Sequence, residues 1–371
     1  MVKFLYGSGK DSNVFYKVRL DIPDPFFFVD LGDVAHIFLD HREYGVFADH
    51  NKNPHIQLHL VNPLYEKLKK YEYFGNSTAA LAYVVLEELG LLHEEVLVPC
   101  NFRLDLADVL RKHNLTITPV DALYPERETK SEQDILATKT ALQHTHHAFA
   151  RIEEILQESS IKGDCVTYKG EVLTSEILKY EASKVFLSYG LVDVEGMIIS
   201  CKNHAAIPHH RGEGPIFANE TIICDLFPRD MRTGHFSDMT RTYVKGEPSD
   251  YVKKMYTAVQ KAQESAIAAI CPGVVMEDVH QVCVDVFLAE GFSVGDTGFI
   301  HGTGHGLGID IHEAPYAKAG SKTVLKEGMV FTVEPGLYYP EHGGIRIEDV
   351  VCVRKEGAEN LTNYPKQLCI V

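Results

Sequence analysis

The chain contains 371 residues, 45% of them hydrophobic and 24% charged, which is the composition of a globular protein with ample material for a core. Its 36 basic and 52 acidic residues give a formal net charge of −16. That charge repels nucleic-acid phosphates and anionic membrane surfaces, so it argues against both as partners, and bound cations would offset part of it. The length favours two domains.

The cysteines and the N-terminus predict a cytoplasmic protein. The eight cysteines are scattered without CxxC spacing, and several lie in apolar runs such as "TIICDLF". In a chain of this length, that pattern predicts reduced, buried thiols rather than a disulfide framework. The first residues, "MVKFLYGSGKDSNVFY", contain no apolar signal segment, and no run of about eighteen apolar residues occurs in the sequence.

Residues 1–125 predict a small α/β domain. The runs "FFFVDL", "AHIFLD" and "EVLVPC" are short and apolar, as expected of strands. Between the second and the third, "NSTAALAYVVLEELG" predicts a helix with a polar start and an end at Gly90. The polar, proline-containing segment "DALYPERETKSEQD" marks the domain boundary.

The second domain, residues 130–371, begins with a predicted amphipathic helix. Ser131 is its expected N-cap and Asp134 occupies the third helical position, a variant of the capping box. Apolar residues then recur every seven positions, at Ile135, Leu142, Phe149 and Leu156. A second helix is expected over roughly 174–189, ending at Gly190.

The order of elements in this domain repeats. Two predicted strands, "ETIICDLF" and "HFSDMTRTYV", follow the first pair of helices. A second pair of helices is expected over 249–270 and about 276–290, and two more strands follow, "GMVFTVEPG" and "GGIRIEDVVCV". Helix, helix, strand, strand therefore occurs twice, which predicts an internal duplication packed around one sheet.

Each of these four predicted strands contains an acidic residue among apolar ones. The four acids are Asp225, Asp238, Glu334 and Glu348. Taken singly, an acid at a strand end is usually a turn or solvated residue. Four carboxylates that converge in a sheet core, however, repel one another and raise each other's pKa values. Two divalent cations would neutralise them, since four carboxylates contribute about −4 and two ions +4.

The ligand types indicate which metals are suitable. Four carboxylates and one imidazole provide mainly oxygen donors, which suit Mn²⁺, with Co²⁺, Fe²⁺ or Zn²⁺ as further candidates. Two such ions can share a bridging water, lower its pKa and stabilise the oxyanion of an attacked carbonyl. The predicted chemistry is metal-assisted hydrolysis.

The imidazole would come from the glycine-rich stretch "HGTGHGLGIDIHEAP", which contains His301, His305 and His312. Histidine is the commonest metal ligand, and glycine allows backbone or substrate to approach closely. Two histidines four residues apart need a helix to share a metal, and these glycines disfavour a helix. "HGTGH" alone is therefore weaker evidence than an HExxH motif, and only the combined pattern supports the prediction.

The assembled motifs resemble those of the creatinase/prolidase-type "pita-bread" metallopeptidases, which include Xaa-Pro aminopeptidases, Xaa-Pro dipeptidases and methionine aminopeptidases. They occur in the family's order: "PHH" at 208, Asp225, "SDMTRT" at 237, "HGTGHGLGIDIHE" at 301, "VEPGLY" at 333 and "GGIRIEDVV" at 343. The resemblance implies an α+β chain in which a smaller α/β creatinase-type domain, resembled more faintly by residues 1–125, precedes a catalytic pita-bread domain.

The resemblance also implies the ligands of two metal ions, namely Asp225, Asp238, His305, Glu334 and Glu348. Asp238 and Glu348 would bridge the ions, and Asp225 would bind one of them through both oxygens. His305 and Glu334 would complete the shell of the other ion, and Glu334 would also transfer the proton of the bridging hydroxide.

Three further histidines are implied as catalytic residues. His209 and His312 resemble the family's substrate-contacting histidines, which steady the carbonyl oxygen or supply a proton to the leaving nitrogen. His301 would line the same cleft. The glycines around these histidines would leave room for a peptide.

Residue alternation suggests supporting side chains. Thr240 shares a strand face with Asp238, and Arg346 shares one with Glu348. Arg346 has two alternative roles, a salt bridge to Glu348 or contact with the C-terminal side of the substrate. Three neighbouring histidines on the first helix of this domain are expected at the surface: His144, His146 and His147.

The leading hypothesis is a dinuclear Xaa-Pro aminopeptidase that resembles aminopeptidase P, with proline-containing peptides as substrates. The alternative within the family is an Xaa-Pro dipeptidase, or prolidase. From other classes, a catalytically silent pita-bread binding protein and a metal-free amidinohydrolase both predict substitutions among the five ligands, and none is substituted. The family's habit implies a homodimer.

Position 316 favours the longer substrate. A strict dipeptidase must capture a carboxylate on the proline itself, which arginine does best. Many prolidases resemble one another in having arginine four residues after the histidine equivalent to His312, where this chain has Tyr316. A tyrosine contributes a substrate hydrogen bond without charge. Xaa-Pro-Yaa peptides should therefore be cleaved better than Xaa-Pro dipeptides, unless Arg346 or Lys318 compensates.

Overall fold

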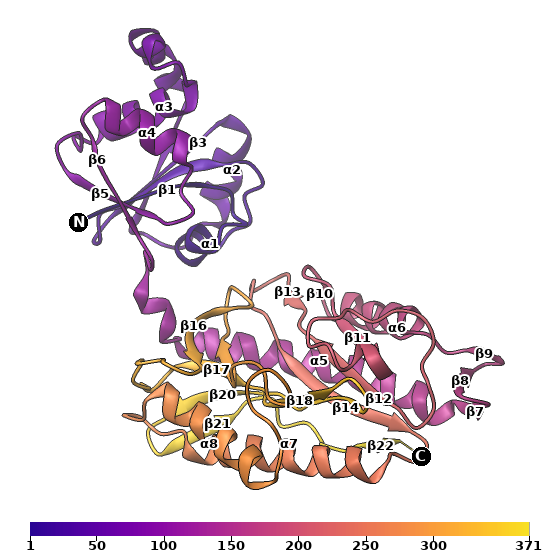
Figure 1. Ribbon diagram of the computed structural model, residues 1–371. Helices are drawn as coiled ribbons and strands as arrows, with labels where there is room; N and C mark the ends of the chain where they lie inside the picture. The colour runs from indigo at the N-terminus through magenta and orange to yellow at the C-terminus, as the bar shows by residue number, and fades with distance from the viewer. Residues whose placement is uncertain (371) are drawn as a thin grey trace. The chain divides into compact units, whose positions relative to one another are not determined.

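The computed structural model describes residues 1–370, which divide into two compact units, Met1–Pro125 and the residues from Glu126 onward. Figure 1 shows both units and labels most of their helices and strands. Within the described residues, no helix combines the length and the apolar character needed to cross a membrane.

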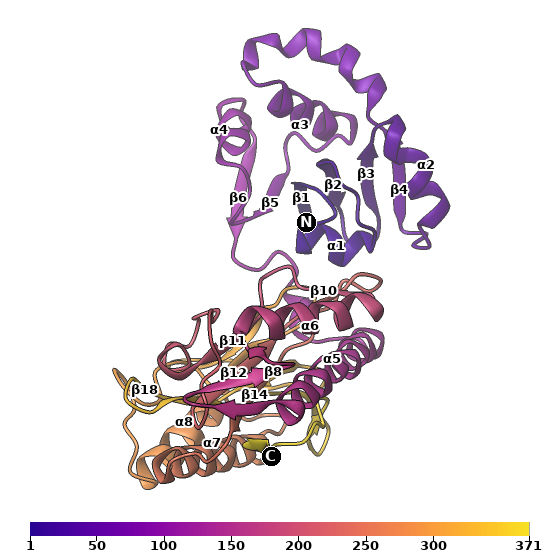
Figure 2. The same cartoon turned by 90° about the vertical axis from the view of Figure 1, so that its right-hand side faces the viewer.

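The N-terminal unit contains a six-stranded mixed sheet with the strand order β4-β3-β2-β1-β5-β6 (Figure 2). Its strands are β1 (Val2–Gly7), β2 (Phe26–Asp30), β3 (Ala35–Leu39), β4 (Ile56–Leu60), β5 (Glu95–Pro99) and β6 (Thr116–Val120). Its helices are α1 (Ser12–Val18), α2 (His41–His50), the 3₁₀ segment η1 (Asn62–Phe74), α3 (Ser77–Glu88) and α4 (Leu104–Lys112). The three strands expected from apolar runs are confirmed as β2, β3 and β5.

Helices cover both faces of this sheet because its strands are apolar on both sides. Phe4 packs with the side chains of α3 and α4, whereas its neighbour Leu5 packs with those of α1 and α2. The expected helix ending at Gly90 is confirmed as α3. The Asn76 side chain accepts the Ala79 N–H at 3.1 Å as the N-cap, and Gly90 follows the helix with φ 71°.

The C-terminal unit repeats two helices followed by strands, as predicted. The first half contains α5 (Glu132–Glu158), α6 (Ser175–Ser188), β11 (Ile198–Cys201), η3 (Lys202–His204), β12 (Thr221–Leu226) and β14 (Met239–Lys245). The second half contains α7 (Asp250–Ala269), α8 (Met276–Ala289), β15 (Gly304–Gly306), β16 (Glu313–Ala317), β17 (Val330–Val333), β18 (Gly336–Tyr339), β19 (Gly343–Arg346), β20 (Asp349–Arg354) and β21 (Gly357–Asn360). Short elements complete it: η2 (Pro125–Glu128), β7 (Ser160–Lys162), β8 (Cys165–Tyr168), β9 (Glu171–Val172), β10 (Leu191–Val192), β13 (Arg229–Asp230) and β22 (Cys369–Ile370).

The strands of this unit form two principal sheets, whereas the repeat had predicted one. The sheets have the orders β11-β12-β14-β22 and β16-β15-β17-β20-β21, and β18-β19 is a separate hairpin. The expected strand "GGIRIEDVVCV" is interrupted at Ile347 and Glu348, between β19 and β20. At this break, the Glu348 N–H donates to the Thr240 carbonyl at 3.1 Å. The two sheets therefore meet where acidic residues lie.

The long helix α5 begins as predicted. Ser131 Oγ accepts the Asp134 N–H at 3.2 Å, and the Asp134 carboxylate accepts the Ser131 N–H at 3.4 Å. The apolar residues that recur every seven positions along this helix are all buried. Leu142 packs with side chains of the second sheet and Phe149 with those of the first, so α5 spans the junction of the two sheets.

The histidines of α5 do not all lie at the surface, contrary to the prediction. His147 is exposed and stacks on Tyr189, with ring centroids 4.4 Å apart. His146 is partly buried, and its ring lies 4.9 Å from that of Tyr364. Positions 142, 146 and 149 share one face of a helix, so the buried stripe includes His146. Burial, together with repulsion from Arg241, lowers the pKa of His146 to about 4.

Acid should destabilise the protein through His146. Its folded-state pKa of about 4 lies below the ordinary 6.5. The contribution of the neutral ring is therefore complete above that ordinary value and is lost as the pH falls toward 4. Allowing for partial exposure, we expect a loss of about 1–2 kcal/mol. In urea unfolding at about pH 7 and about pH 4.5, His146→Gln should lose less stability in acid than wild type, whereas exposed His147→Gln should match wild type. Equal losses in all three proteins would contradict the assignment.

Candidate metal centre

The five predicted metal ligands lie at the junction of the two sheets of the C-terminal unit. Asp225 lies within β12 and His305 within β15. The other three acids occupy strand ends: Asp238 directly precedes β14, Glu334 directly follows β17, and Glu348 directly precedes β20. Strands from both halves of the duplication therefore contribute two acids each.

Candidate ligand atoms of Asp238, His305 and Glu348 all lie within 4.8 Å of one another. His305 Nε2 lies 3.2 Å from Glu334 Oε1 and 3.6 Å from Asp238 Oδ2. Asp225, Asp238 and Glu348 are buried, with exposed fractions of 8%, 4% and 2%. The structure thus brings the predicted acids and the imidazole into one buried group.

Two carboxylate oxygens show that protein side chains alone do not satisfy this group. Asp225 Oδ1 and Glu348 Oε1 are buried and have no hydrogen-bond partner among residues 1–370. A buried carboxylate oxygen without a partner is costly in free energy, and a divalent cation supplies the missing partner. The residues present therefore fit a metal site with mainly oxygen donors.

The electrostatics of the protein groups lead to the same conclusion. Burial and then repulsion from the other acids raise the pKa values of Asp238 and Glu348 well above their ordinary values. Burial also raises the pKa of Asp225, although Arg346 opposes that shift. For Glu334, the effect of burial is outweighed by the hydrogen bond and charge of His305, so its pKa falls to about 2. Divalent cations would relieve this repulsion.

Two threonine hydroxyls orient the candidate ligands. Thr240 Oγ1 donates to Glu348 Oε2 at 2.7 Å, so Thr240 supports the site through Glu348, although alternation had associated it with Asp238. Thr332 Oγ1 donates to Glu334 Oε1 at 3.0 Å and accepts the His305 N–H at 3.0 Å. Thr332 is not among the site residues predicted from the sequence. The available signal was its position two residues before Glu334, on the same face of the strand.

Arg346 forms its ion pair with Asp225, whereas one predicted alternative had paired it with Glu348. Its Nη2 donates to Asp225 Oδ2 at 2.7 Å, and its Nη1 donates to the Tyr338 hydroxyl at 2.8 Å. The residue is 3% exposed. The guanidinium therefore supports Asp225 from within the protein.

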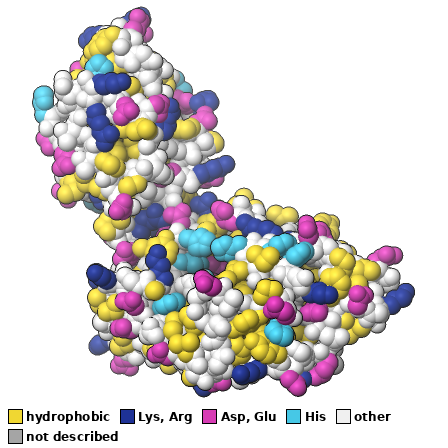
Figure 3. Space-filling model, viewed as in Figure 1, with side chains coloured by type: hydrophobic (Ala, Val, Ile, Leu, Met, Phe, Trp, Pro, Cys, Tyr) yellow, Lys and Arg dark blue, Asp and Glu magenta, His cyan; other side chains and the backbone are white. Residues whose placement is uncertain are grey.

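A pocket of about 430 Å³ lies over this buried group. Its lining includes all five candidate ligands and the other predicted site residues: His209, His301, His312, Tyr316, Lys318 and Arg346. Figure 3 shows histidine side chains gathered on one face of the C-terminal unit. The lining also includes residues that the sequence analysis missed: Glu195, Arg211 and Phe227.

Two of the pocket histidines are held in the neutral form. Burial lowers the pKa values of His301 and His312. His301 Nδ1 lies 2.7 Å from the Gly302 carbonyl, to which it donates, so its Nε2, 3.0 Å away, accepts from the Tyr338 hydroxyl. The His312 ring meets that of His305 edge to face, with centroids 4.2 Å apart. Neutral imidazoles can both donate and accept hydrogen bonds to a peptide.

The site and its sequence motifs agree with a known family. The family model for metallopeptidase family M24 matches residues 137–355. This chain belongs to metallopeptidase family M24. It is therefore a peptidase, and the predicted α+β pita-bread fold is confirmed.

This M24 peptidase is similar to several proteins that are named as dipeptidases. It is 34% identical to a Mycobacterium tuberculosis protein named probable dipeptidase PepE over 275 residues, which cover 74% of this chain and 68% of that protein. It is 29% identical over 339 residues to an Xaa-Pro dipeptidase from Pyrococcus furiosus, covering 91% of this chain and 87% of that one. A solved dipeptidase structure from Pyrococcus horikoshii matches with a TM-score of 0.79 and 27% identity, covering 100% of this chain and 96% of that one.

Gly304 and Gly306, on either side of His305, allow close strand packing, and Gly304 also lines the pocket, where the sequence predicts that glycines leave room for a peptide. A Cβ at Gly304 would lie 1.8 Å from the Thr332 carbonyl oxygen, and one at Gly306 would lie 2.3 Å from that of Ala314. β15 therefore lies unusually close to its neighbours β16 and β17. This close packing brings His305 against Thr332 and Glu334 in the M24 peptidase.

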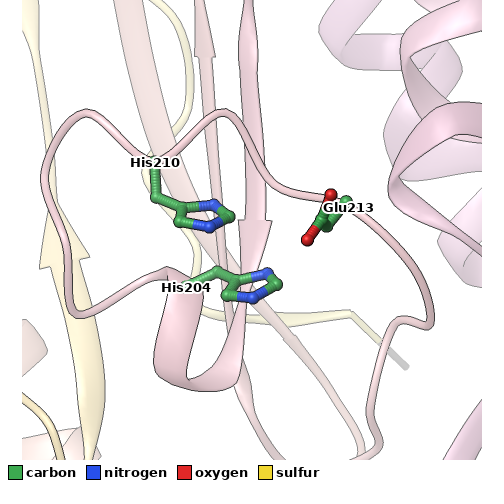
Figure 4. Close-up of side chains that lie close together, drawn as sticks. All are labelled: His204, His210 and Glu213. Atoms are coloured by element: carbon green, nitrogen blue, oxygen red, sulfur yellow. The ribbon is translucent and has the colours of Figure 1, made fainter.

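A second group of metal-binding residue types, His204, His210 and Glu213, lies outside the pocket lining (Figure 4). The rings of His204 and His210 are stacked, with centroids 3.8 Å apart and planes 14° apart. An imidazole nitrogen binds a metal in the plane of its ring, so two nearly parallel rings do not direct their lone pairs at one ion. His210 Nδ1 also accepts the Gly212 N–H at 3.0 Å. The stacking of His204 on His210 and this hydrogen bond therefore stabilise the loop that contains His209.

Proposed function

We propose that this M24 peptidase hydrolyses the Xaa-Pro bond of proline-containing peptides with two divalent ions, Mn²⁺ above all, and that dipeptides are its preferred substrates. The observation that carries the proposal is the buried group of four carboxylates and His305 beneath a pocket lined by three further histidines. Its similarity over 91% of the chain to a protein named Xaa-Pro dipeptidase supports the choice of bond.

The five candidate ligands would hold the ions: Asp225, Asp238, His305, Glu334 and Glu348. When bound, two such ions activate a water molecule and stabilise the negative charge that develops on the attacked carbonyl. Asp225 Oδ1 and Glu348 Oε1, which have no hydrogen-bond partner in the described chain, would each gain a cation. The preponderance of oxygen donors favours Mn²⁺ over softer metals.

In this proposal, the protein's own side chains position the peptide and move protons. The Glu334 carboxylate, kept ionised beside His305, accepts a proton from the attacking water. His209 and His312 line the pocket and donate hydrogen bonds to the peptide. Because the nitrogen of an Xaa-Pro bond has no hydrogen, it must gain a proton as it leaves, and a neutral imidazole N–H supplies one.

The proposed preference for dipeptides is the opposite of the preference for Xaa-Pro-Yaa peptides that Tyr316 predicts. Tyr316 lines the pocket and brings no charge, as expected. Two cationic side chains, Arg211 and Lys318, line the same pocket, and either can offset the negative charge of a dipeptide carboxylate. The names of the three reported relatives support the same choice, because each is called a dipeptidase. Aminopeptidase P-like activity on Xaa-Pro-Yaa is the second candidate, which Tyr316 favours.

A comparison of kcat/KM for an Xaa-Pro dipeptide and its Xaa-Pro-Yaa extension tests the proposal. With Mn²⁺ present, the dipeptide should be preferred by about tenfold or more, because extension moves the carboxylate away from the cations. A clear preference for the tripeptide would make the protein an aminopeptidase of the P type. If the protein cleaves neither the dipeptide nor the tripeptide, Xaa-Pro specificity is contradicted.

The remaining alternatives have less support. A silent binding protein or a metal-free amidinohydrolase requires substitutions among the five ligands, and all five positions are filled. The homodimer, the cytoplasmic location and the division into a creatinase-type domain over 1–125 and a catalytic domain over 130–371 stay predictions from the sequence.

A further inference from the structure

We propose that Arg211 binds the C-terminal carboxylate of the dipeptide substrate, and this inference rests on the proposed function. Arg211 lies in the loop between β11 and β12, two residues after His209, and both side chains line the pocket over the candidate metal ligands. The arginine found in many prolidases would lie after His312, on β16, where this chain has Tyr316.

Neighbouring side chains of this loop differ in whether they line the pocket. The His210 side chain stacks on His204 (Figure 4) and is not part of the pocket lining, whereas His209 and Arg211, on either side of it in sequence, line the pocket. Arg211 therefore shares the pocket with His209, a candidate substrate-contacting residue.

The backbone of Arg211 is fixed against β11. Its carbonyl accepts the Ile199 N–H at 3.0 Å. The next residue, Gly212, lies so close to β11 that an added Cβ would be 1.7 Å from the Ile199 carbonyl oxygen. Lys179 Nζ donates to the Gly212 carbonyl at 2.8 Å. Because the backbone is already ordered, binding a carboxylate would require ordering of the Arg211 side chain but no ordering of its backbone.

The guanidinium of Arg211 is available for a ligand. Within the described residues, Arg346 pairs with Asp225, whereas Arg211 forms no ion pair, not even with Glu195 of the same pocket lining. An added Cβ at Gly196 would lie 3.0 Å from Arg211 Nη1, so the glycine leaves space for the guanidinium. Its Cζ lies 5.9 Å from the Phe227 ring centroid.

Arg211 suits a carboxylate better than the other two cations of the pocket lining. Its planar guanidinium can form two parallel hydrogen bonds to the two carboxylate oxygens. Lys318 offers a single point charge on a flexible stem, and its Nζ lies 5.4 Å from the Tyr316 ring centroid. The Arg346 guanidinium is occupied by Asp225 and Tyr338. In a chain with a net charge of −16, an unpaired guanidinium is a specific attraction for an anionic substrate end.

The test compares an Xaa-Pro dipeptide with its C-terminal amide, which has the same scissile bond but no carboxylate. For wild type, kcat/KM should be higher for the acid than for the amide. Arg211→Gln should lower kcat/KM for the acid by about 10- to 100-fold, mainly through KM, and change the amide by less than about threefold. Arg211→Lys keeps the charge but not the two parallel hydrogen bonds, so its kcat/KM for the acid should lie between those of wild type and Arg211→Gln.

Lys202→Gln is the matched control, because Lys202 is on the same loop, packs over Phe217 and is absent from the pocket lining. Lys202→Gln should leave kcat/KM unchanged for both the acid and the amide. The proposal is overturned if Arg211→Gln lowers kcat/KM equally for the acid and the amide, or lowers it for neither. It is also overturned if Lys318→Gln, instead of Arg211→Gln, lowers kcat/KM selectively for the acid. Failure of Xaa-Pro specificity is separate: wild type would then cleave other dipeptides but not Xaa-Pro. The acid and amide of such a dipeptide would test Arg211 in the same way.

Discussion

Removal of divalent metal should abolish peptide cleavage by this M24 peptidase, and Mn²⁺ or Co²⁺ should restore it. The proposed ions activate the attacking water and stabilise the charge on the carbonyl, so activity should fall by more than about 100-fold without them. Dialysis against a chelator, followed by assays with each added metal and elemental analysis of the protein, measures the effect.

Thermal unfolding provides an independent reading of the same experiment. An ion that binds only the folded protein raises its stability, so Mn²⁺ should raise the unfolding temperature of the chelated protein in a concentration-dependent way. Circular dichroism should show that the chelated protein stays folded. Full turnover by protein shown to contain no metal would rule out the dinuclear mechanism.

Asp238→Asn and Glu348→Gln should each remove metal binding and lower kcat by about 1000-fold or more, because each substitution keeps the side-chain size and deletes a charge from a position proposed to hold both ions. The chelated variants should be at least as stable as chelated wild type, since they relieve repulsion among buried carboxylates. Calorimetric titration with Mn²⁺ and urea unfolding of the chelated proteins measure the two effects separately.

Asp349→Asn is a matched control for Glu348→Gln, its neighbour in sequence. Asp349 is also buried, but Arg241 and Lys366 pair with it at 2.8 and 3.0 Å, so its charge is satisfied within the protein. Removing that charge should leave the buried Arg241 guanidinium without a carboxylate to pair with, and so lower stability, while the proposed ions still bind. Two ions bound to Asp238→Asn or Glu348→Gln with wild-type affinity would show that these residues do not bridge metals.

Local sequence patterns predicted the elements well because the forces that form them act over short stretches. The capping box of Ser131 and Asp134 and the apolar stripe of α5 involve residues a few positions apart, and both are confirmed. The same periodicity would have found His146 in the buried face had it been applied to polar residues. The acids of the four strands were visible for a related reason, because an acid in an apolar run conflicts with burial.

The partners of the site residues could not be predicted in this way. Arg346 pairs with Asp225, which is 121 positions away, and Thr240 with Glu348, which is 108 away. Alternation along one strand shows which face a side chain occupies, but not which strand of the other half lies opposite. The break between β19 and β20 and the separation of the strands into two sheets depend on that same packing.

The sequence by itself determined the duplicated architecture, the residue types of the proposed metal site and the motif order of the M24 family, because periodicity, charge and spacing are written along the chain. Only the tertiary structure decided which oxygens lack a partner, why Gly304 must be glycine, and that Arg346 pairs with Asp225 whereas Arg211 forms no ion pair within residues 1–370. Those features depend on distances between residues far apart in sequence, and such distances exist only after the two halves of the C-terminal unit have packed together.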